Sequence, residues 1–360
     1  MIYDILKRCE KITTNIFNYI TNDSGYITNN DTIIFGPEFN MELNPEILIY
    51  YKKIIFSDYK LDANLFDAYA DNNFNKPKYY DSLFNKPLGN SLFKLINLTE
   101  IKFGYSFNQL LQDSLSKLIN LKLINFGHCF NQPLGNSLDK LINLTHLTFT
   151  NNFNQPLANS LDHLINLTHL TFGNWFDQPL GNSLDKLINL TYLTFGYSFN
   201  QFLANLLDKL INLTLINFGD DFNQPISNVL YNLTKLQCLK LGYKFNQDLI
   251  LPPNIKILIL DCHNINLIDN LPNSIEQLVL SHKFNSSLNN LPSSIKIISF
   301  TVGSDYNHPL DNLPNSIEKL KLPYNYNIQI KNIPIGLKKI ICSKSYEFID
   351  DFIGLEIKTY

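Results

Sequence analysis

The chain has 360 residues, of which 45% are hydrophobic and 17% charged, and this balance excludes wholesale disorder. Its formal net charge is −3 and its lysines are spread along the chain, so it has no general attraction for phosphate backbones or anionic lipid. We therefore expect neither nucleic acid nor a membrane surface as a partner.

Cysteine usage and the N-terminal stretch indicate a reducing compartment. The five cysteines are odd in number, widely separated and without the spacing of a disulfide framework or a metal site. Charged residues between Asp4 and Lys11 interrupt the apolar segment that a secretory signal needs. No run approaches the roughly 18 apolar residues that span a bilayer. We predict a cytoplasmic protein.

Residues 1–32 differ from the rest of the chain and are the candidate N-terminal cap. We expect them to be helical to about Ile20, because the end of a repeat array must be covered. Repeat register begins at residue 33 with Ile-Ile-Phe-Gly-Pro-Glu-Phe-Asn. The pattern is lost from Asp62 to Tyr80, which predicts an irregular repeat or a loop there.

The main signal is a 23-residue repeat. A phenylalanine followed by Asn or Asp recurs with seven successive spacings of 23 residues. These phenylalanines are Phe84, Phe107, Phe130, Phe153, Phe176, Phe199, Phe222 and Phe245. A typical unit, 130–152, reads FNQPLGNSLDKLINLTHLTFTNN. A fixed period of this length indicates a solenoid of stacked turns.

Each unit divides into a predicted strand and a predicted outer limb. The segment Leu144-x-x-Leu147-x-Phe149 matches the core pattern of leucine-rich repeats, in which a short strand turns alternate side chains inward. We therefore expect Leu147 and Phe149 to be buried. In the outer limb, Leu138, Leu141 and Ile142 lie at i, i+3 and i+4, which predicts one apolar side of a short helix.

The Asn or Asp after each phenylalanine has two interpretations. It is either a turn residue at the surface, or a member of a buried ladder whose side chains satisfy corner backbone groups without a strand partner. We favour the ladder. Its predicted members are Asn85, Asn108, Asn131, Asn154, Asp177, Asn200, Asn223 and Asn246.

After Phe245 the unit shortens. Segments such as 271–280, LPNSIEQLVL, recur at 20 to 22 residues, and LP-x-S-I replaces the helical limb. We predict one α/β repeat solenoid of about fourteen turns over 33–345, a curved stack of short parallel strands with short helical or irregular outer limbs. Its 23-residue units cover about 84–244 and its LPxSI units about 245–345. Residues 346–360 are the candidate C-terminal cap.

The repeated Phe-Asn-x-Pro-Leu, followed by LP-x-S-I-x-x-L-x-L, resembles the FNIP-repeat proteins of amoebae and their large DNA viruses over about 33–345. FNIP repeats look like a subclass of leucine-rich repeats, so the resemblance implies the same curved fold and, for a viral protein, the host cytoplasm. Many members of that family carry an N-terminal F-box, which implies substrate selection for ubiquitin ligation. Residues 1–38 show no recognisable F-box. The alternative function is a substrate-recognition subunit of an F-box-type ubiquitin ligase, with a divergent N-terminal adaptor segment and ubiquitin-ligase components as partners.

Four positions in each unit vary while the others barely change. Two are outward strand positions, which alternation places on the concave sheet, and two follow the strand. Variation confined to such a face is typical of recognition, so we predict a scaffold that binds a protein partner; drift among recent duplicates and a purely structural spacer are the alternatives. The predicted partner-binding residues are Glu100, Tyr105, His146, His169, Trp175, Tyr192, Tyr197, Asp220 and Tyr243.

No pattern in the sequence predicts catalysis, a metal or a cofactor. Phosphate-binding, dinucleotide-binding and nucleophile-elbow motifs are absent. His146 and His169 fall on adjacent predicted strands with His128 near them, but no acidic or cysteine pair at a convincing spacing completes a metal site. We expect a non-enzymatic protein, and the sequence does not identify its partner.

Overall fold

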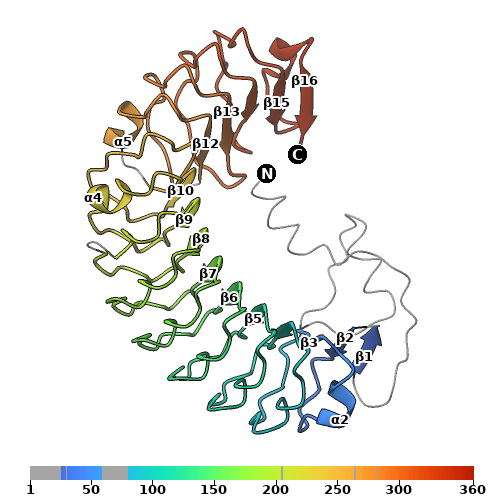
Figure 1. Ribbon diagram of the computed structural model, residues 1–360. Coiled ribbons are helices and arrows are strands. Elements are labelled where there is room, and N and C mark those ends of the chain that lie inside the picture. Colours follow the sequence, from blue (N-terminus) through green and yellow to red (C-terminus); the bar gives the residue numbers. More distant parts are fainter. Residues whose placement is uncertain (1–25, 30, 59–79, 204–205, 263–264, 282) are drawn as a thin grey trace.

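The computed structural model describes residues 26–29, 31–58, 80–203, 206–262, 265–281 and 283–360. Their strands form one 16-stranded sheet in chain order (Figure 1). β1 pairs antiparallel with β2, and each later strand pairs parallel with the strand before it. The strands are β1 (Tyr26–Asn29), β2 (Thr32–Phe35), β3 (Lys53–Phe56), β4 (Glu100–Lys102), β5 (Leu123–Asn125), β6 (His146–Thr148), β7 (His169–Thr171), β8 (Tyr192–Thr194), β9 (Leu215–Asn217), β10 (Cys238–Leu241), β11 (Ile257–Leu260), β12 (Gln277–Leu280), β13 (Ile297–Phe300), β14 (Lys319–Lys321), β15 (Lys339–Cys342) and β16 (Glu356–Thr359).

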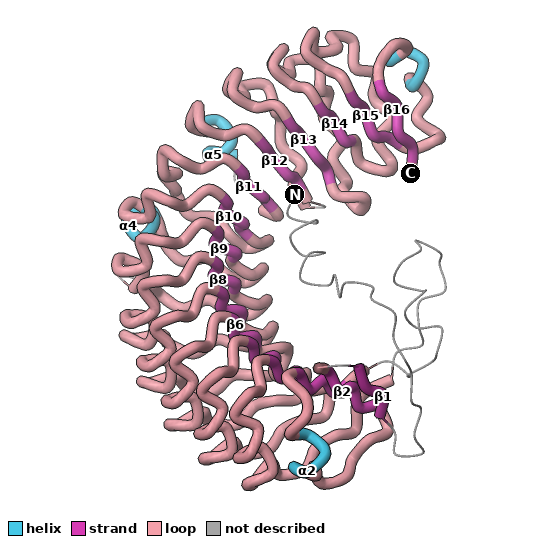
Figure 2. Tube along the Cα trace, turned by 45° about the vertical axis from the view of Figure 1, so that its right-hand side comes forward, coloured by secondary structure: helices cyan, strands magenta, loops and turns pink. Residues whose placement is uncertain are grey.

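The sheet is curved, and its strands line the inner, concave side of the stack while loops and turns form the outer side (Figures 1 and 2). Helical segments in the described part of the chain are few and short. They are α2 (Pro45–Leu48), α4 (Ser227–Leu230), α5 (Ile265–Asp269) and the 3-10 helix η1 (Ile349–Phe352). The predicted solenoid of short parallel strands is thus confirmed.

The outer limb of the 23-residue unit is not the short helix that its apolar spacing predicts. Residues 136–144 form successive turns in which the N–H of Leu141 donates to the carbonyl of Leu138, and that of Leu144 to the carbonyl of Leu141. Such i to i+3 bonding gives three residues per turn, so positions i and i+3 align but position i+4 is rotated away. Leu138 and Leu141 are accordingly buried, whereas Ile142 is 49% exposed.

The core is a continuous column of apolar side chains through successive turns. In β6, His146 faces outward and Leu147 is fully buried, as strand alternation requires. The ring of Phe149 stacks on that of Phe153 at 4.0 Å between centroids, and Phe153 lies 6.0 Å from Phe176 of the next turn. Stacked rings stabilise the column beyond what burial alone contributes. The predicted burial of Leu147 and Phe149 is therefore correct.

A column of glycines lies where the strands of the 23-residue units end: Gly104, Gly127, Gly173, Gly196, Gly219 and Gly242. A Cβ on Gly196 would lie 2.0 Å from the carbonyl oxygen of Gly173. Glycine is favoured at these six positions because the backbones of successive turns approach closely there. In one turn Thr150 takes this position, and its hydroxyl donates to the carbonyl of Phe126 at 3.0 Å.

Both predicted cap regions contain strands where the structure describes them. Residues 26–32, within the predicted cap but beyond its expected helix, contain β1 and the first residue of β2, because Ile27 alternates inward in an extended segment. Residues 1–25, and most of the stretch 62–80, lie outside the described part of the chain. Residues 346–360, the predicted C-terminal cap, contribute η1 and then β16, which extends the sheet parallel to β15.

Candidate functional site

Five side chains in register form a ladder on the concave face, and we call them the concave ladder: Leu123, His146, His169, Tyr192 and Leu215. They are the first residues of β5 to β9. The imidazoles of His146 and His169 stack at 4.1 Å between centroids, and His169 stacks on Tyr192 at 4.2 Å. The structure therefore brings three predicted site residues together, because parallel strands lie only about 4.8 Å apart.

Threonine hydroxyls orient the two imidazoles. Thr145 Oγ1 lies 2.9 Å from the carbonyl oxygen of Lys122 and 2.9 Å from Nδ1 of His146. The single hydroxyl hydrogen is donated to the carbonyl, so Nδ1–H of the imidazole donates to Oγ1 and Nε2 is left as an acceptor. Thr168 holds His169 in the same way, at 3.0 Å and 2.8 Å. Sequence reasoning missed this role, although a Thr precedes both histidines.

Both imidazoles are neutral at pH 7. Burial, with a smaller contribution from His146, lowers the pKa of His169 to about 4. Burial also lowers the pKa of His146, and the carboxylate of Glu100 opposes that shift. Desolvation disfavours the charged imidazolium in each case. The centre of the ladder is therefore an uncharged surface that offers hydrogen-bond acceptors.

The concave face is uncharged over β5 to β9 and charged on either side. The second outward column there consists of Asn and Thr residues: Asn125, Thr148, Thr171, Thr194 and Asn217. On β4 the carboxylate of Glu100 pairs with Lys102 at 2.8 Å, and β10 carries Lys240. Leu123 of β5 lies between Glu100 of β4 and His146 of β6 in the register, so Glu100 is not in contact with the stacked rings.

The remaining predicted binding residues lie in the loops after the strands and not on the strands themselves. These residues are Tyr105, Trp175, Tyr197, Asp220 and Tyr243, and we call this edge the rim. Trp175, Tyr197 and Tyr243 are 58%, 49% and 45% exposed, so the rim is open to a partner that overlaps the edge of the concave face.

One end of the rim is a hydrogen-bonded row that sequence reasoning did not foresee. The Tyr105 ring stacks on His128 at 4.3 Å between centroids. Asn151 Nδ2 lies 3.1 Å from a ring nitrogen of His128, and Asn174 Nδ2 donates to Asn151 Oδ1 at 2.9 Å. These four residues occupy the same position in successive units, and this spacing was the sequence signal from which the row could have been predicted.

The Asn or Asp that follows the first phenylalanine of each 23-residue unit forms hydrogen bonds to the next turn. Asn131 Oδ1 accepts from the backbone N–H of Asn154 at 2.9 Å and from Gln155 Nε2 at 3.0 Å. Equivalent backbone bonds of 2.8–3.0 Å link successive positions from Asn85 to Asn246. The side chains are half-buried or exposed, so the expected burial is wrong. An amide that reaches along the surface to the next turn does not need to enter the core.

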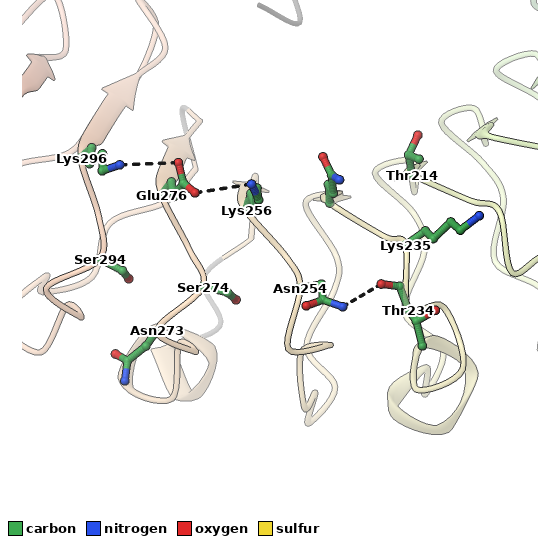
Figure 3. Close-up of a pocket in the computed structure, with 11 residues that line it drawn as sticks. Thr214, Thr234, Lys235, Asn254, Lys256, Asn273, Ser274, Glu276, Ser294 and Lys296 are labelled. Carbon is green, nitrogen blue, oxygen red and sulfur yellow. Dashed lines mark hydrogen bonds and ion pairs between the residues drawn. The ribbon is translucent and has the colours of Figure 1, made fainter.

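An open polar groove lies along the edge where strands begin, and Figure 3 shows the part between Thr214 and Lys296. Lys256 and Lys296 approach the carboxylate of Glu276 at 3.7 Å and 3.9 Å. The lining consists of hydroxyl, amide and amine groups with this one carboxylate, and no thiol or imidazole is among the residues described there. The hydroxyls of Ser274 and Ser294 in this lining have no hydrogen-bond partner among the described residues, so no base is placed to activate either of them as a nucleophile.

Other chemistry was sought over the residues whose structure is described. No group of three or more His, Cys, Asp or Glu side chains there could hold a metal ion. No helix in those segments is long and apolar enough to cross a membrane. Burial raises the pKa of Cys238, beside the ladder on β10, to about 12, so its thiol is protonated and a poor nucleophile at pH 7.

Comparison with known proteins agrees with the repeat pattern and the fold. The FNIP Repeat family matches residues 306–345. The chain is similar to CroV588, a novel circular LRR protein, with 28% identity and a TM-score of 0.60 over 88% of this chain and 50% of that one. An internalin, InlF of Listeria monocytogenes, shares the fold with 15% identity and a TM-score of 0.51, over 87% of this chain and 89% of that one. The chain thus spans half the length of the circular protein. No curated protein matches.

Proposed function

Because the chain carries an FNIP repeat and folds as a leucine-rich-repeat-like solenoid, we propose that it is a non-catalytic scaffold that binds a protein partner on its concave face. A curved solenoid presents an extended inner surface, and such surfaces are the usual binding faces of repeat proteins. We place its action in the cytoplasm, in keeping with the spacing of its cysteines.

The concave ladder is the observation that carries this proposal. Its three rings stack on one another in the middle of a face whose other outward side chains are hydroxyls, amides and two leucines. Rings held in a rigid stack lose little conformational entropy when a partner covers them. Aromatic residues surrounded by uncharged neighbours are typical of the centre of a protein interface.

The chemistry of the face defines the partner. Nε2 of His146 and of His169 are acceptors, so the partner supplies N–H or O–H donors above them. Leu123 and Leu215 at the two ends of the ladder favour apolar side chains there. We infer an uncharged segment with donors at its centre, flanked by charges that face Glu100, Lys102 and Lys240.

The test compares partner recovery by three forms of the full chain in proximity labelling from host cytoplasm. One is unchanged, one carries His169→Ala and Tyr192→Ala, and one carries Tyr231→Ala, which alters a 78% exposed ring next to α4 on the outer side. We expect the ladder variant to lose at least about tenfold of a partner that the other two forms recover equally. Equal recovery by all three forms would refute the concave site.

The ubiquitin-ligase alternative depends on residues 1–38, and residues 1–25 and 30 lie outside the described part of the chain. It stays a prediction with its own test. Co-purification of a cullin adaptor that is lost when residues 1–25 are removed would support it. The concave variants would leave that adaptor bound while they release the substrate.

A further inference from the structure

Seven exposed isoleucines run across successive turns outside the concave face, and we call them the isoleucine stripe: Ile49, Ile96, Ile119, Ile142, Ile165, Ile188 and Ile211. Each lies four residues before the first residue of its strand, from β3 to β9. They are 43–55% exposed. An apolar row of this length on a folded surface calls for an explanation, whereas single exposed isoleucines do not.

Hydrogen bonds set the spacing of the stripe. From Ile119 to Ile211, the Nδ2 group of the asparagine that follows the isoleucine donates to the carbonyl of the isoleucine in the preceding turn. For example, Asn143 donates to Ile119 at 2.9 Å and Asn166 to Ile142 at 2.8 Å. The same bond recurs over five steps, from Asn120 to Asn212. The isoleucines from Ile96 to Ile211 are therefore held at one regular interval.

The fold itself does not require isoleucine at this position. From β10 to β14, the residue four places before each strand is polar or proline: Thr234, Pro253, Asn273, Ser293 and Asn315. These turns stack in the same parallel sheet as the others. Apart from Ile335 before β15, the isoleucines at this position belong to the β3 to β9 part, so a role in packing of the turns does not account for them.

We propose that the isoleucine stripe is a self-association surface that packs against the same stripe of a second copy of this chain. Seven half-exposed isoleucines present on the order of 600 Å² of apolar surface, the upper range for a single patch on a monomer. Two such stripes bury about 1,200 Å², the lower limit of a stable interface. The partner must present apolar side chains at the same interval along the whole stripe. A second copy of this chain meets that requirement, because it carries the same stripe.

A twofold axis satisfies this geometry. Ile142 is the middle member, so in an antiparallel pair it meets Ile142 of the second copy, and Ile49 meets Ile211. Charges beside the stripe are in part already paired within the chain, since Lys94 pairs with Glu46 and Lys209 with Asp185. Intramolecular pairing reduces the repulsion between like lysines when two copies approach.

The experiment is sedimentation equilibrium of the full chain over a range of concentrations up to about 100 μM. The unchanged chain is expected to form a reversible dimer. The double substitution Ile142→Asn with Ile165→Asn is expected to weaken that dimer at least about tenfold, because it places polar groups at the centre of the stripe. Asparagine is the substitute because Asn273 and Asn315 occupy the same position in other turns.

The control is Ile250→Asn with Ile353→Asn, two isoleucines that are 81% and 83% exposed outside the stripe. It should leave the dimer unchanged, and circular dichroism would check that each variant is folded. If the double variant unfolds, Ile142→Thr alone, which copies Thr234, gives a milder test. A chain that is monomeric at every concentration, or a dimer that both variants leave intact, would overturn the proposal. Neither result bears on the concave face, which lies elsewhere on each turn.

Discussion

The 23-residue units and the LPxSI units stack their turns at the same strand spacing but secure the corners differently. In the 23-residue units a strand phenylalanine and a corner phenylalanine stack in each turn, as Phe172 and Phe176 do at 4.2 Å between centroids. In the LPxSI units leucine replaces the strand ring in several turns, and the corner ring is tyrosine at Tyr306, Tyr326 and Tyr346. One sheet therefore continues across two chemically different corners.

Hydrogen bonds between the corners differ in the same way. The asparagine bonds of the 23-residue units are 2.8–3.0 Å long. Their LPxSI counterparts are longer, at 3.2 Å from the N–H of Asn307 to Asn285 Oδ1 and 3.3 Å from the N–H of Glu347 to Asn327 Oδ1. Two of the three corner tyrosines there also bond along the stack, since Tyr326 Oη–H donates to the carbonyl of His308 at 3.1 Å and Tyr346 Oη–H to that of Ile328 at 2.8 Å. The comparison teaches that the stack needs a bond at each corner but accepts either an amide or a phenol.

The largest effect should come from breaking the phenylalanine column. Phe176→Ala removes a fully buried ring that contacts Phe153, Phe172 and Phe199, and should cost about 3–5 kcal/mol of unfolding free energy. Urea denaturation measures it. Trp175→Ala, at the adjacent 58% exposed position, is the control and should change the free energy by less than about 0.5 kcal/mol. Equal costs for the two would contradict a continuous core.

The glycine corner should give the next largest effect, about 2–3 kcal/mol for Gly196→Ala, because the new Cβ would lie 2.0 Å from a backbone oxygen that cannot move freely. The control Gly135→Ala meets no atom within 4 Å, and its φ of +50° should cost only about 1 kcal/mol. The LPxSI units carry Ser281 and Thr301 at the corner where Gly196 lies. Thr301→Gly, which removes a hydroxyl without a hydrogen-bond partner in the described part of the chain, should therefore leave the midpoint of urea unfolding nearly unchanged, and a large shift would go against the comparison.

The amide ladder should respond to loss of an acceptor and not to loss of an amide. Asn154→Leu removes the oxygen that accepts from the N–H of Asp177 and from Gln178, and should cost about 1–3 kcal/mol. Asn154→Asp keeps that oxygen, as Asp177 does naturally, and should cost much less. Chemical denaturation of the two variants decides the matter. Equal losses would show that the amide group itself is required.

A smaller effect is expected for the phenol corners. Tyr326→Phe keeps the ring but removes the hydroxyl that donates to the carbonyl of His308 at 3.1 Å, and should cost about 0.5–1.5 kcal/mol. Tyr324→Phe, two residues earlier and 47% exposed, is the matched control. Thermal unfolding of both variants would measure the difference. If Tyr326→Phe and Tyr324→Phe unfold at the same temperature, the Tyr326 hydroxyl does not stabilise the corner in place of the asparagine bond.

The last effect concerns pH and is confined to the 23-residue units. The pKa of His169 is lowered in the folded chain to about 4, so the unfolded chain binds its proton first as the pH falls below about 6.5. Stability from this group is therefore complete above pH 6.5 and is lost as the pH falls toward 4. His169→Tyr keeps the stack, as Tyr192 does, and should reduce the loss between pH 7 and pH 4.5 in urea titrations. If the His169→Tyr variant lost as much stability between pH 7 and pH 4.5 as the unchanged chain, His169 would be excluded as a source of that loss.

Much of the fold follows from periodicity, because a strict spacing of Phe130, Phe153 and Phe176 allows only a stack in which equivalent residues adjoin. The outer limb could not be predicted in the same way. Ile142 suits an α-helix by spacing, but the limb bonds i to i+3, and a choice between these two geometries depends on the packing of neighbouring turns. The strands β1 and β2 were not predicted as a pair, because a β-hairpin at that end has no repeat to reveal it.

The candidate site was only partly accessible to sequence. Alternation along β6 to β8 correctly places His146, His169 and Tyr192 in one outward column. The direction of Trp175 and Tyr197 was not predictable, since they lie in loops where alternation no longer applies. The tautomer of the histidines depends on the shared hydroxyl of the preceding threonine, which requires atomic positions.

The asparagine ladder has a direction, since the Oδ1 atom of each turn accepts from the N–H of the turn after it. Every 23-residue turn therefore offers an acceptor toward one neighbour and a donor toward the other, regardless of its place in the row. An extra unit duplicated between any two others would find a matching group on each side. Such an array can lengthen or shorten by whole units during evolution without new contacts between turns. The outward columns of the added units are then free to diverge.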